Sequence, residues 1–279
     1  MHPELLHIGP LTVHSYGVML ALAVLVGLTV ARREAVRQGY DGDAFLELSV
    51  YLIIAGLFGS RVLYVLLAWP SFAGDPLAVL RVWEPGLSYY GAIGLGALLA
   101  IWFARRRGWR FGRLGDVLAL GVAAGYPVAR IGCFLNGCCY GKPATVPWAV
   151  AFPFDGIPRH PTQLYSLALG LLIFGVLWWR RRRAAPPGYL MWLYFLLYAA
   201  YRFVMDFWRV SLPGVGGLTL TQMAALPIMA TAVAALVYLK RGRSERDAAE
   251  QSKKIRACQR VRVRDILYLV YGVVLGPPA

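Results

Sequence analysis

Seven apolar runs occupy most of the chain, and short polar or glycine- and proline-rich segments separate them. The runs cover 13–31, 46–68, 87–104, 114–129, 164–179, 188–207 and 218–239. A helix that crosses a bilayer needs about 17–25 mostly apolar residues, and most of the runs have this length. The pattern therefore predicts an all-α membrane protein, a polytopic bundle of about seven transmembrane helices.

The composition agrees with a membrane protein. The chain has 279 residues, of which 58% are hydrophobic and 15% are charged, whereas about a quarter of a soluble domain is charged. The first ten residues, MHPELLHIGP, carry no basic cluster before the first apolar run. We therefore expect no cleavable signal peptide.

The net charge of +15 is distributed unevenly between the loops. Of the 29 Lys and Arg residues, 22 lie in 32–46, 105–113, 180–187 and 240–264. The positive-inside rule assigns these loops to the cytoplasm. It thus predicts an outside N-terminus, a cytoplasmic C-terminus and contact with anionic membrane lipid. Nucleic-acid binding is not expected, because no basic stripe has base-stacking aromatic residues beside it.

A change in composition suggests two parts. Residues 1–239 form the expected transmembrane domain, and residues 240–279 form a basic cytoplasmic tail. The apolar end of the tail, 266–275, is too short to span a bilayer, and its pattern suits an anchor in the interface.

The ionisable residues inside the apolar runs include Arg61, Arg202 and Asp206. A charge in the middle of a spanning helix costs about 2.5–3.5 kcal/mol on insertion scales, so each is expected to face a partner or a cavity. Arg202 and Asp206 are four residues apart and share a helix face, which allows them to pair. A purely structural pair, with Arg209 at the interface, is one interpretation.

The second interpretation is a binding site. In the predicted topology, several cations gather near the outer ends of the helices. They are Arg61, Arg130, Arg159, His160, Arg202 and Arg209. Guanidinium groups bind phosphate with bidentate geometry. The gathering therefore predicts a site for a phosphate-bearing lipid in the outer leaflet.

The stretch ARIGCFLNGCCYGKPA, residues 129–144, holds three of the four cysteines. The spacing of Cys133, Cys138 and Cys139 lacks the paired C-x2-C typical of zinc sites, although His160 would add one ligand. On the oxidising side, a disulfide from Cys133 to Cys138 or to Cys139 is favoured. A membrane thiol–disulfide enzyme remains an alternative. We expect no metal and no cofactor.

An ordered set of motifs resembles a known family. The motifs are HSYGVMLALAV, GSRVLYVL, LSYYGAIG, ARIGCFLNGCCYG, RHPTQLYS, YRFVMDFWR and LTLTQMAALP. In this order they resemble the prolipoprotein diacylglyceryl transferases of bacterial inner membranes, from about Tyr16 to Leu239. The matching positions include Arg130, Asn136, Gly141, Arg202 and Arg209.

The chain departs from the family pattern at four positions. Tyr90 stands where the family has histidine, Cys133 where it has asparagine and Cys138 where it has glutamate. Asp206 stands in place of a glutamate. The phosphate-binding half of the pattern is thus retained, while the half that would orient or deprotonate a thiol differs. A paralogue with an altered lipid substrate is therefore a further alternative.

The resemblance implies a reaction and its residues. Phosphatidylglycerol gives its diacylglyceryl group to the lipobox cysteine thiol in the signal peptide of a prolipoprotein, and glycerol phosphate leaves. The implied catalytic residues are Arg130 and Arg202, which hold the phosphate, and Tyr90 and Tyr16, which position groups or transfer a proton. The implied substrate-binding residues are Arg130, Asn136, Gly141, Arg61, Arg209, Asp206 and His160. The implied location is the bacterial inner (plasma) membrane, with the active site toward the outer leaflet.

Overall fold

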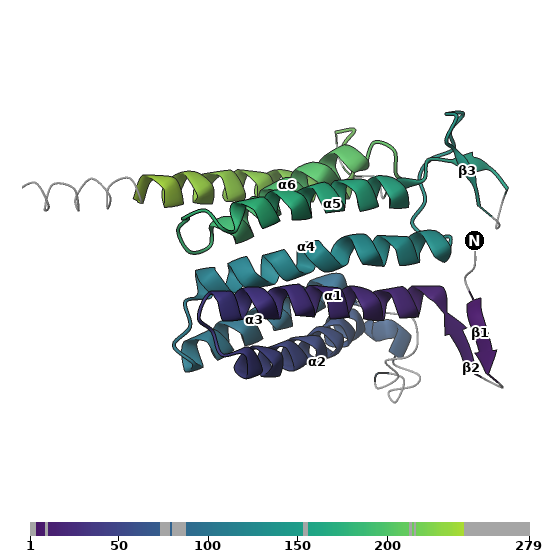
Figure 1. The fold of residues 1–279 in the computed structure, drawn as a ribbon. Helices are drawn as coiled ribbons and strands as arrows, with labels where there is room; N and C mark the ends of the chain where they lie inside the picture. The colour runs from purple at the N-terminus through teal and green to yellow at the C-terminus, as the bar shows by residue number, and fades with distance from the viewer. Residues whose placement is uncertain are drawn as a thin grey trace, which may run out of the picture. The chain divides into compact units, whose positions relative to one another are not determined.

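The computed structural model describes residues 4–8, 11–72, 79, 88–152, 156–211, 214 and 216–242. Seven long helices dominate these residues (Figure 1). They are α1 (Ser15–Arg37), α2 (Gly42–Leu67), α3 (Tyr89–Arg106), α4 (Phe111–Leu135), α5 (Thr162–Arg180), α6 (Tyr189–Met205) and a last helix, Leu220–Gly242. Each predicted apolar run overlaps one of them, which confirms the mostly helical membrane fold. A short 3-10 helix, η1 (Trp69–Phe72), follows α2.

Five of the helices are long and apolar enough to cross a membrane: α1, α2, α4, α5 and Leu220–Gly242. The apolar helix α6 has 17 residues and is shorter. Several helices extend beyond the apolar runs, because charged residues continue them. Helix α1, for example, continues through Arg32 and Arg33 to Arg37. Charged residues flanking a run therefore lengthen the helix without lengthening its apolar part.

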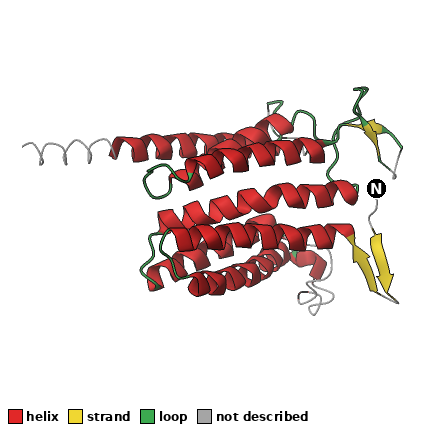
Figure 2. Ribbon diagram, viewed as in Figure 1, coloured by secondary structure: helices red, strands yellow, loops and turns green. Residues whose placement is uncertain are grey.

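Two small antiparallel sheets add to the helices (Figure 2). Strand β1 (Glu4–Ile8) pairs with β2 (Leu11–His14), and β3 (Val150–Ala151) pairs with β4 (Pro158–Arg159). Strand β2 leads directly into α1, and β4 leads into α5 two residues later. The sequence analysis did not predict these strands, which are too short to show an alternating pattern.

Helix α4 lies between α1 and α5 (Figure 1). Small residues bring the backbones of α1 and α4 together. A Cβ atom built on Gly121 would lie 2.8 Å from the carbonyl oxygen of Gly27. One built on Gly125 would lie 2.5 Å from that of Ala23. Since neither position has room for a larger side chain, these glycines fix how closely α1 approaches α4.

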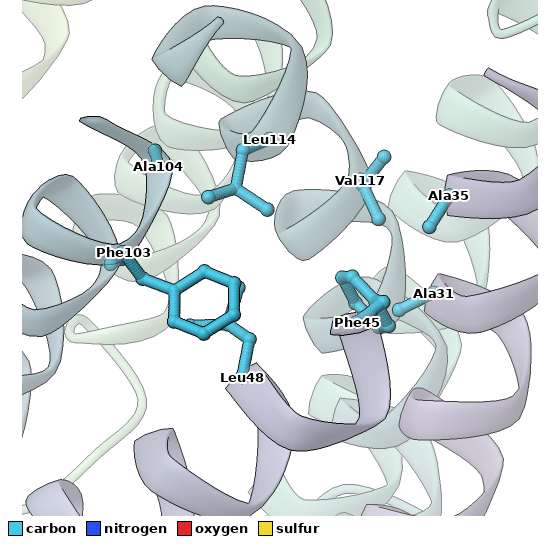
Figure 3. Packing of buried hydrophobic residues seen from close by; sticks show 9 residues of the cluster. Ala31, Ala35, Phe45, Leu48, Phe103, Ala104, Leu114 and Val117 are labelled. Carbon is cyan, nitrogen blue, oxygen red and sulfur yellow. The ribbon is translucent and has the colours of Figure 1, made fainter. Parts of the chain in front are cut away.

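Two buried clusters hold the helices around α4. The first cluster joins four helices, α1, α2, α3 and α4. It consists of Ala31, Ala35, Phe45, Leu48, Ala100, Phe103, Ala104, Leu114 and Val117 (Figure 3). The second joins α4 to α5 and α6 through Leu120, Ala123, Ile173, Leu177, Leu190, Tyr201 and Met205. The first cluster lies near the start of α4, at the opposite end of that helix from Arg130.

Buried acids fix the end of the bundle where α4 starts. The Asp116 carboxylate accepts hydrogen bonds from the backbone N–H groups of Gly188 and Met191, at 2.8 and 2.9 Å. It thereby satisfies donors at the start of α6. Glu34 is fully buried in α1, and Arg37, Gln38 and Arg181 donate to its carboxylate.

By internal contacts the chain divides into two compact units, Met1–Ala232 and Val233–Ala279. The site described below lies entirely in the first. In the second, the described residues are 233–242, the end of the last helix. The predicted tail, from residue 243 onward, and Cys258 lie outside the described residues. The prediction of separate parts at 1–239 and 240–279 stays a prediction.

Candidate functional site at the end of helix α4

Arg130 lies near the end of α4 and has no anionic partner in the part of the chain that the structure describes. Its guanidinium carbon lies 4.6 Å from the ring centroid of Tyr126, a cation–π distance. Its Nη1 lies 3.9 Å from Sγ of Cys133. Its Nε is buried, and among the described residues it has neither a hydrogen-bond acceptor nor a carboxylate. A buried cation is costly without a counter-charge, so this arrangement suits an anionic ligand.

A series of hydrogen-bonded hydroxyl groups holds the Tyr126 ring, against which the Arg130 guanidinium lies. The Tyr201 hydroxyl donates to Oγ of Ser166, which donates to the carbonyl of Thr162, both at 2.6 Å. The Tyr126 and Tyr201 hydroxyls are 2.7 Å apart. Because Tyr201 donates its proton to Ser166, Tyr126 is the donor to Tyr201. These hydrogen bonds thus connect Tyr126 on α4 to Tyr201 on α6 and to Ser166 on α5.

The loop after α4 is held by the first turn of α5. The Thr162 hydroxyl donates to the carbonyl of Cys139 at 2.8 Å, and the buried Gln163 side chain donates to that of Cys138 at 2.7 Å. Cys139 has a φ of 64°, which is uncommon for a residue other than glycine. These two hydrogen bonds therefore stabilise a loop conformation that the backbone alone disfavours.

Cys133, near the end of α4, and the loop residues Cys138 and Cys139 form one cluster of thiols. Their Sγ atoms all lie within 4.8 Å of one another. Cys133 is buried, while Cys138 and Cys139 are half-buried. Hydrogen bonds from Cys133 and Cys138, followed by the charges of Arg209 and Arg130, lower the pKa of the Cys139 thiol.

The favoured loop disulfide is absent from the structure. Cys133, Cys138 and Cys139 are all free thiols. The disulfide was expected because the loop lies on the predicted oxidising side of the membrane. In the structure, hydrogen bonds from Thr162 and Gln163 to the loop carbonyls restrain the loop instead.

Gly141 brings the strand-like segment after α6 against the loop. It forms an isolated antiparallel bridge with Arg209, and its N–H donates to the carbonyl of His160 at 3.0 Å. A Cβ atom on Gly141 would lie 2.6 Å from the carbonyl oxygen of Trp208 and 2.8 Å from Cβ of His160. Only glycine fits there, and through it Arg209 is held beside the thiol cluster.

We expect Gly141→Ala to lower the activity of the site by about tenfold or more, because backbone carbonyls cannot yield to the new methyl group as a flexible side chain would. The loop would shift, and Arg209 with it. Activity in membranes, normalised to the amount of folded protein, measures the effect. The control is Gly175→Ala in α5, where nothing lies within 4 Å of the added Cβ. Equal activities in the two variants would contradict this role for Gly141.

Three other residues predicted from the sequence, His160, Asn136 and Tyr16, lie on segments next to the end of α4. Nδ1 of His160 lies 3.2 Å from the Tyr165 hydroxyl, to which the Trp148 indole also donates. Asn136 is the C-cap of α4. A Cβ atom on Gly132 would lie 3.6 Å from Cα of Tyr16, so Tyr16, at the start of α1, lies against the helix turn that carries Cys133.

The predicted pairing of Arg202 with Asp206 is wrong. Asp206 is buried at the C-cap of α6, and its carboxylate accepts hydrogen bonds from the hydroxyls of Ser211 and Thr219. Among the described residues, no ion pair joins it to Arg202. Spacing along one helix could not predict partners from the segment that follows. Arg202 itself lies in the last turn of α6, next to Tyr201.

Arg61 and Tyr90 belong to other helices than Arg130, α2 and α3. Arg61 is buried in α2, where its Nε donates to the carbonyl of Val79 at 3.0 Å and its guanidinium lies 5.5 Å from the ring centroid of Phe72. Tyr90 is in the first turn of α3. Its side chain lies outside the described residues, so its predicted catalytic role stays a prediction.

Comparison with known proteins identifies the family. The sequence model of the family described as prolipoprotein diacylglyceryl transferase matches residues 3–238. Three proteins, each named phosphatidylglycerol–prolipoprotein diacylglyceryl transferase, are similar over most of their length. The one from Chromohalobacter salexigens is 36% identical, covering 86% of this chain and 92% of the relative. The one from Nitratidesulfovibrio vulgaris (strain DSM 19637 / Miyazaki F) is 35% identical, covering 88% and 97%. The one from Bordetella avium is 34% identical, covering 81% and 90%.

The chain belongs to the prolipoprotein diacylglyceryl transferase family. The matched region contains every described residue of the site, from Tyr16 on α1 to Arg209 after α6. In this family member, the thiols of Cys133 and Cys138 occupy two positions beside Arg130.

Sequence reasoning missed several residues that shape the site of this family member. Tyr126, Tyr201 and Ser166 form the hydroxyl chain, and Thr162 and Gln163 hold the cysteine loop. One signal was present, since Thr162 and Ser166 are four residues apart, on one face of a mostly apolar helix.

Proposed function

We propose that this chain transfers the diacylglyceryl group of phosphatidylglycerol to the lipobox cysteine thiol of prolipoproteins. The observation that carries the proposal is the half-buried Arg130 guanidinium, whose Nε is buried, which has no counter-charge among the described residues and which lies against the Cys133 thiol. Its family membership supplies the reaction class.

Arg130 would hold the phosphate of the lipid. A guanidinium donates two parallel hydrogen bonds to phosphate oxygens, and the unpartnered Nε belongs to one such donor edge. Glycerol phosphate leaves with an added negative charge as the bond from the glyceryl carbon to oxygen breaks. A fixed cation beside that oxygen stabilises the transition state more than the ground state.

The remaining residues would act around this clamp. Arg209 adds a second cation, held by the bridge to Gly141. Arg202, Tyr16 and Tyr90 are proposed to contact the lipid or the thiol. Asn136 would bind substrate at the C-cap of α4, whereas His160 and Asp206 act by holding the surrounding segments.

The proposed setting is the bacterial plasma membrane. We propose seven crossings, with the N-terminus outside, the C-terminus in the cytoplasm and the site toward the outer leaflet. The arginine-rich ends of α1, α3 and α5 support this orientation, because they lie at the opposite ends of the helices from Tyr16, Cys133 and Thr162. Signal peptides of prolipoproteins would meet the site from the outer side.

Expression in cells depleted of their own diacylglyceryl transferase tests the proposal. A reporter prolipoprotein is expected to gain the mass of one diacylglyceryl group, and growth is expected to recover. A reporter with serine in place of the lipobox cysteine is the control, and it should gain nothing. An unmodified reporter, in cells where the chain is inserted and folded, would contradict the proposed function.

A further inference from the structure

The cysteine cluster has the composition of a metal site. Cys133 in the last turns of α4 and Cys138 and Cys139 in the loop after it place their Sγ atoms within 4.8 Å of one another. A zinc–sulfur bond is about 2.3 Å long, so three thiolates on one tetrahedral ion lie roughly 3.8 Å apart. Modest side-chain rotation therefore suffices to bring all three onto a single ion.

The surroundings of the cluster favour bound thiolates. Three thiolates on a divalent cation carry one net negative charge. Arg130 lies 3.9 Å from Sγ of Cys133 and has no carboxylate partner among the described residues. Arg209 is held by its bridge to Gly141, two residues after Cys139. The loop is also pre-formed, because Thr162 and Gln163 fix the carbonyls of Cys139 and Cys138.

The fourth coordination position is open in this arrangement. His160, the fourth ligand considered from the sequence, has its Nδ1 beside the Tyr165 hydroxyl. Within the described part of the chain, the ligand group consists of the three cysteines alone. Zinc sites with three protein ligands and an open position are typical of catalysis, whereas structural sites are closed by four ligands.

We propose that Cys133, Cys138 and Cys139 bind one zinc ion, whose open position takes the lipobox thiol of the substrate. The inference rests on the proposed function and deepens it. It departs from the expectation of no metal, which relied on the C-x4-C-C spacing and not on where the fold places the sulfur atoms. It also supplies what the family histidine, replaced by Tyr90, would otherwise contribute.

The reaction then balances in the following way. The lipobox thiol binds zinc as a thiolate and releases its proton to water. A lone pair of this sulfur attacks the glyceryl carbon of phosphatidylglycerol, so that a sulfur–carbon bond forms as the carbon–oxygen bond to phosphate breaks. The electron pair of the broken bond leaves on glycerol phosphate, next to Arg130. The thioether product binds zinc more weakly than a thiolate and departs.

Metal analysis of the purified full-length protein tests the site. The protein is prepared in detergent under reducing, oxygen-free conditions, in a Cys258→Ser background so that every remaining thiol belongs to the cluster. We expect about one zinc per chain, and almost none in Cys133→Ala or Cys138→Ala. Cys139→Ser, the smallest change, should also lose zinc while leaving the protein folded by gel filtration.

Cobalt tests the open position. Cobalt(II) replacing zinc should show thiolate charge-transfer absorption and the strong visible bands of tetrahedral coordination. A lipobox peptide with its cysteine should increase the charge-transfer absorption, and the same peptide with serine should leave it unchanged. Absence of bound metal, a cluster isolated as a disulfide, or a cobalt spectrum indifferent to the cysteine peptide would each overturn the inference.

The failure of this inference can be distinguished from failure of the proposed function. Transfer that persists after complete metal removal would keep the function and overturn the zinc site. A cobalt spectrum that responds to the cysteine peptide, without any transfer from phosphatidylglycerol, would keep the site and overturn the proposed lipid reaction.

Discussion

Replacing Arg130 by alanine should lower diacylglyceryl transfer by a factor of about 10²–10³, the effect of removing one charge-stabilising donor from an active site. The substitution removes the guanidinium beside Cys133 and leaves the leaving phosphate without its counter-charge. Arg130→Lys keeps a charge but loses the paired donors, so its activity should be intermediate. Initial rates with purified protein measure both.

The control for Arg130 is Arg33→Ala, an exposed arginine near the far end of α1. It should retain near-normal rates. Insertion and folding of Arg130→Ala are checked by gel filtration, since removal of a buried unpaired cation is not expected to destabilise the bundle. Undiminished transfer by Arg130→Ala would disprove the phosphate clamp.

The second large effect is on stability. Glu34→Ala should lower the free energy of unfolding by about 3–5 kcal/mol, the usual cost of breaking a buried ion pair. The Arg181 side chain is 9% exposed and lies 3.1 Å from the Glu34 carboxylate. Without Glu34, the Arg181 charge would stay largely buried and uncompensated. Thermal unfolding in detergent measures the loss as a lower midpoint temperature.

A double variant separates the pair from its surroundings. Glu34→Ala with Arg181→Ala should be less destabilised than the sum of the single changes, because no charge is left unpaired. Asp43→Ala, which breaks the exposed pair with Arg32 at 3.3 Å, should change stability by less than about 1 kcal/mol. Equal losses from Glu34→Ala and Asp43→Ala would show that burial of the Glu34 pair does not matter.

The helices could be predicted from the sequence because length and hydrophobicity alone determine a membrane span. The ends of the helices could not. Helix α4 begins at Phe111 and ends at Leu135, although the apolar run was 114–129. Pro127 lies inside it, where neighbouring helices can compensate for the interrupted backbone.

The site was predicted unevenly, because spacing in the sequence shows which residues share a helix but not which segments meet in space. Arg130 was identified from its charge at a helix end. Asp206 binds Ser211 and Thr219, which both follow α6 in the chain. The expected pairing of Asp206 with Arg202 was therefore wrong. Likewise, Gln163 reaches the Cys138 carbonyl only because α5 folds against the end of α4.

The central claim is tested most directly with purified protein in a bilayer that contains phosphatidylglycerol. A lipobox peptide is added, and its intact mass is measured together with the released headgroup. We predict that the peptide gains one diacylglyceryl group, that glycerol phosphate appears in equal amount, and that phosphatidylethanolamine cannot replace phosphatidylglycerol. An unmodified peptide in the presence of folded protein would contradict the account, as would modification without release of glycerol phosphate.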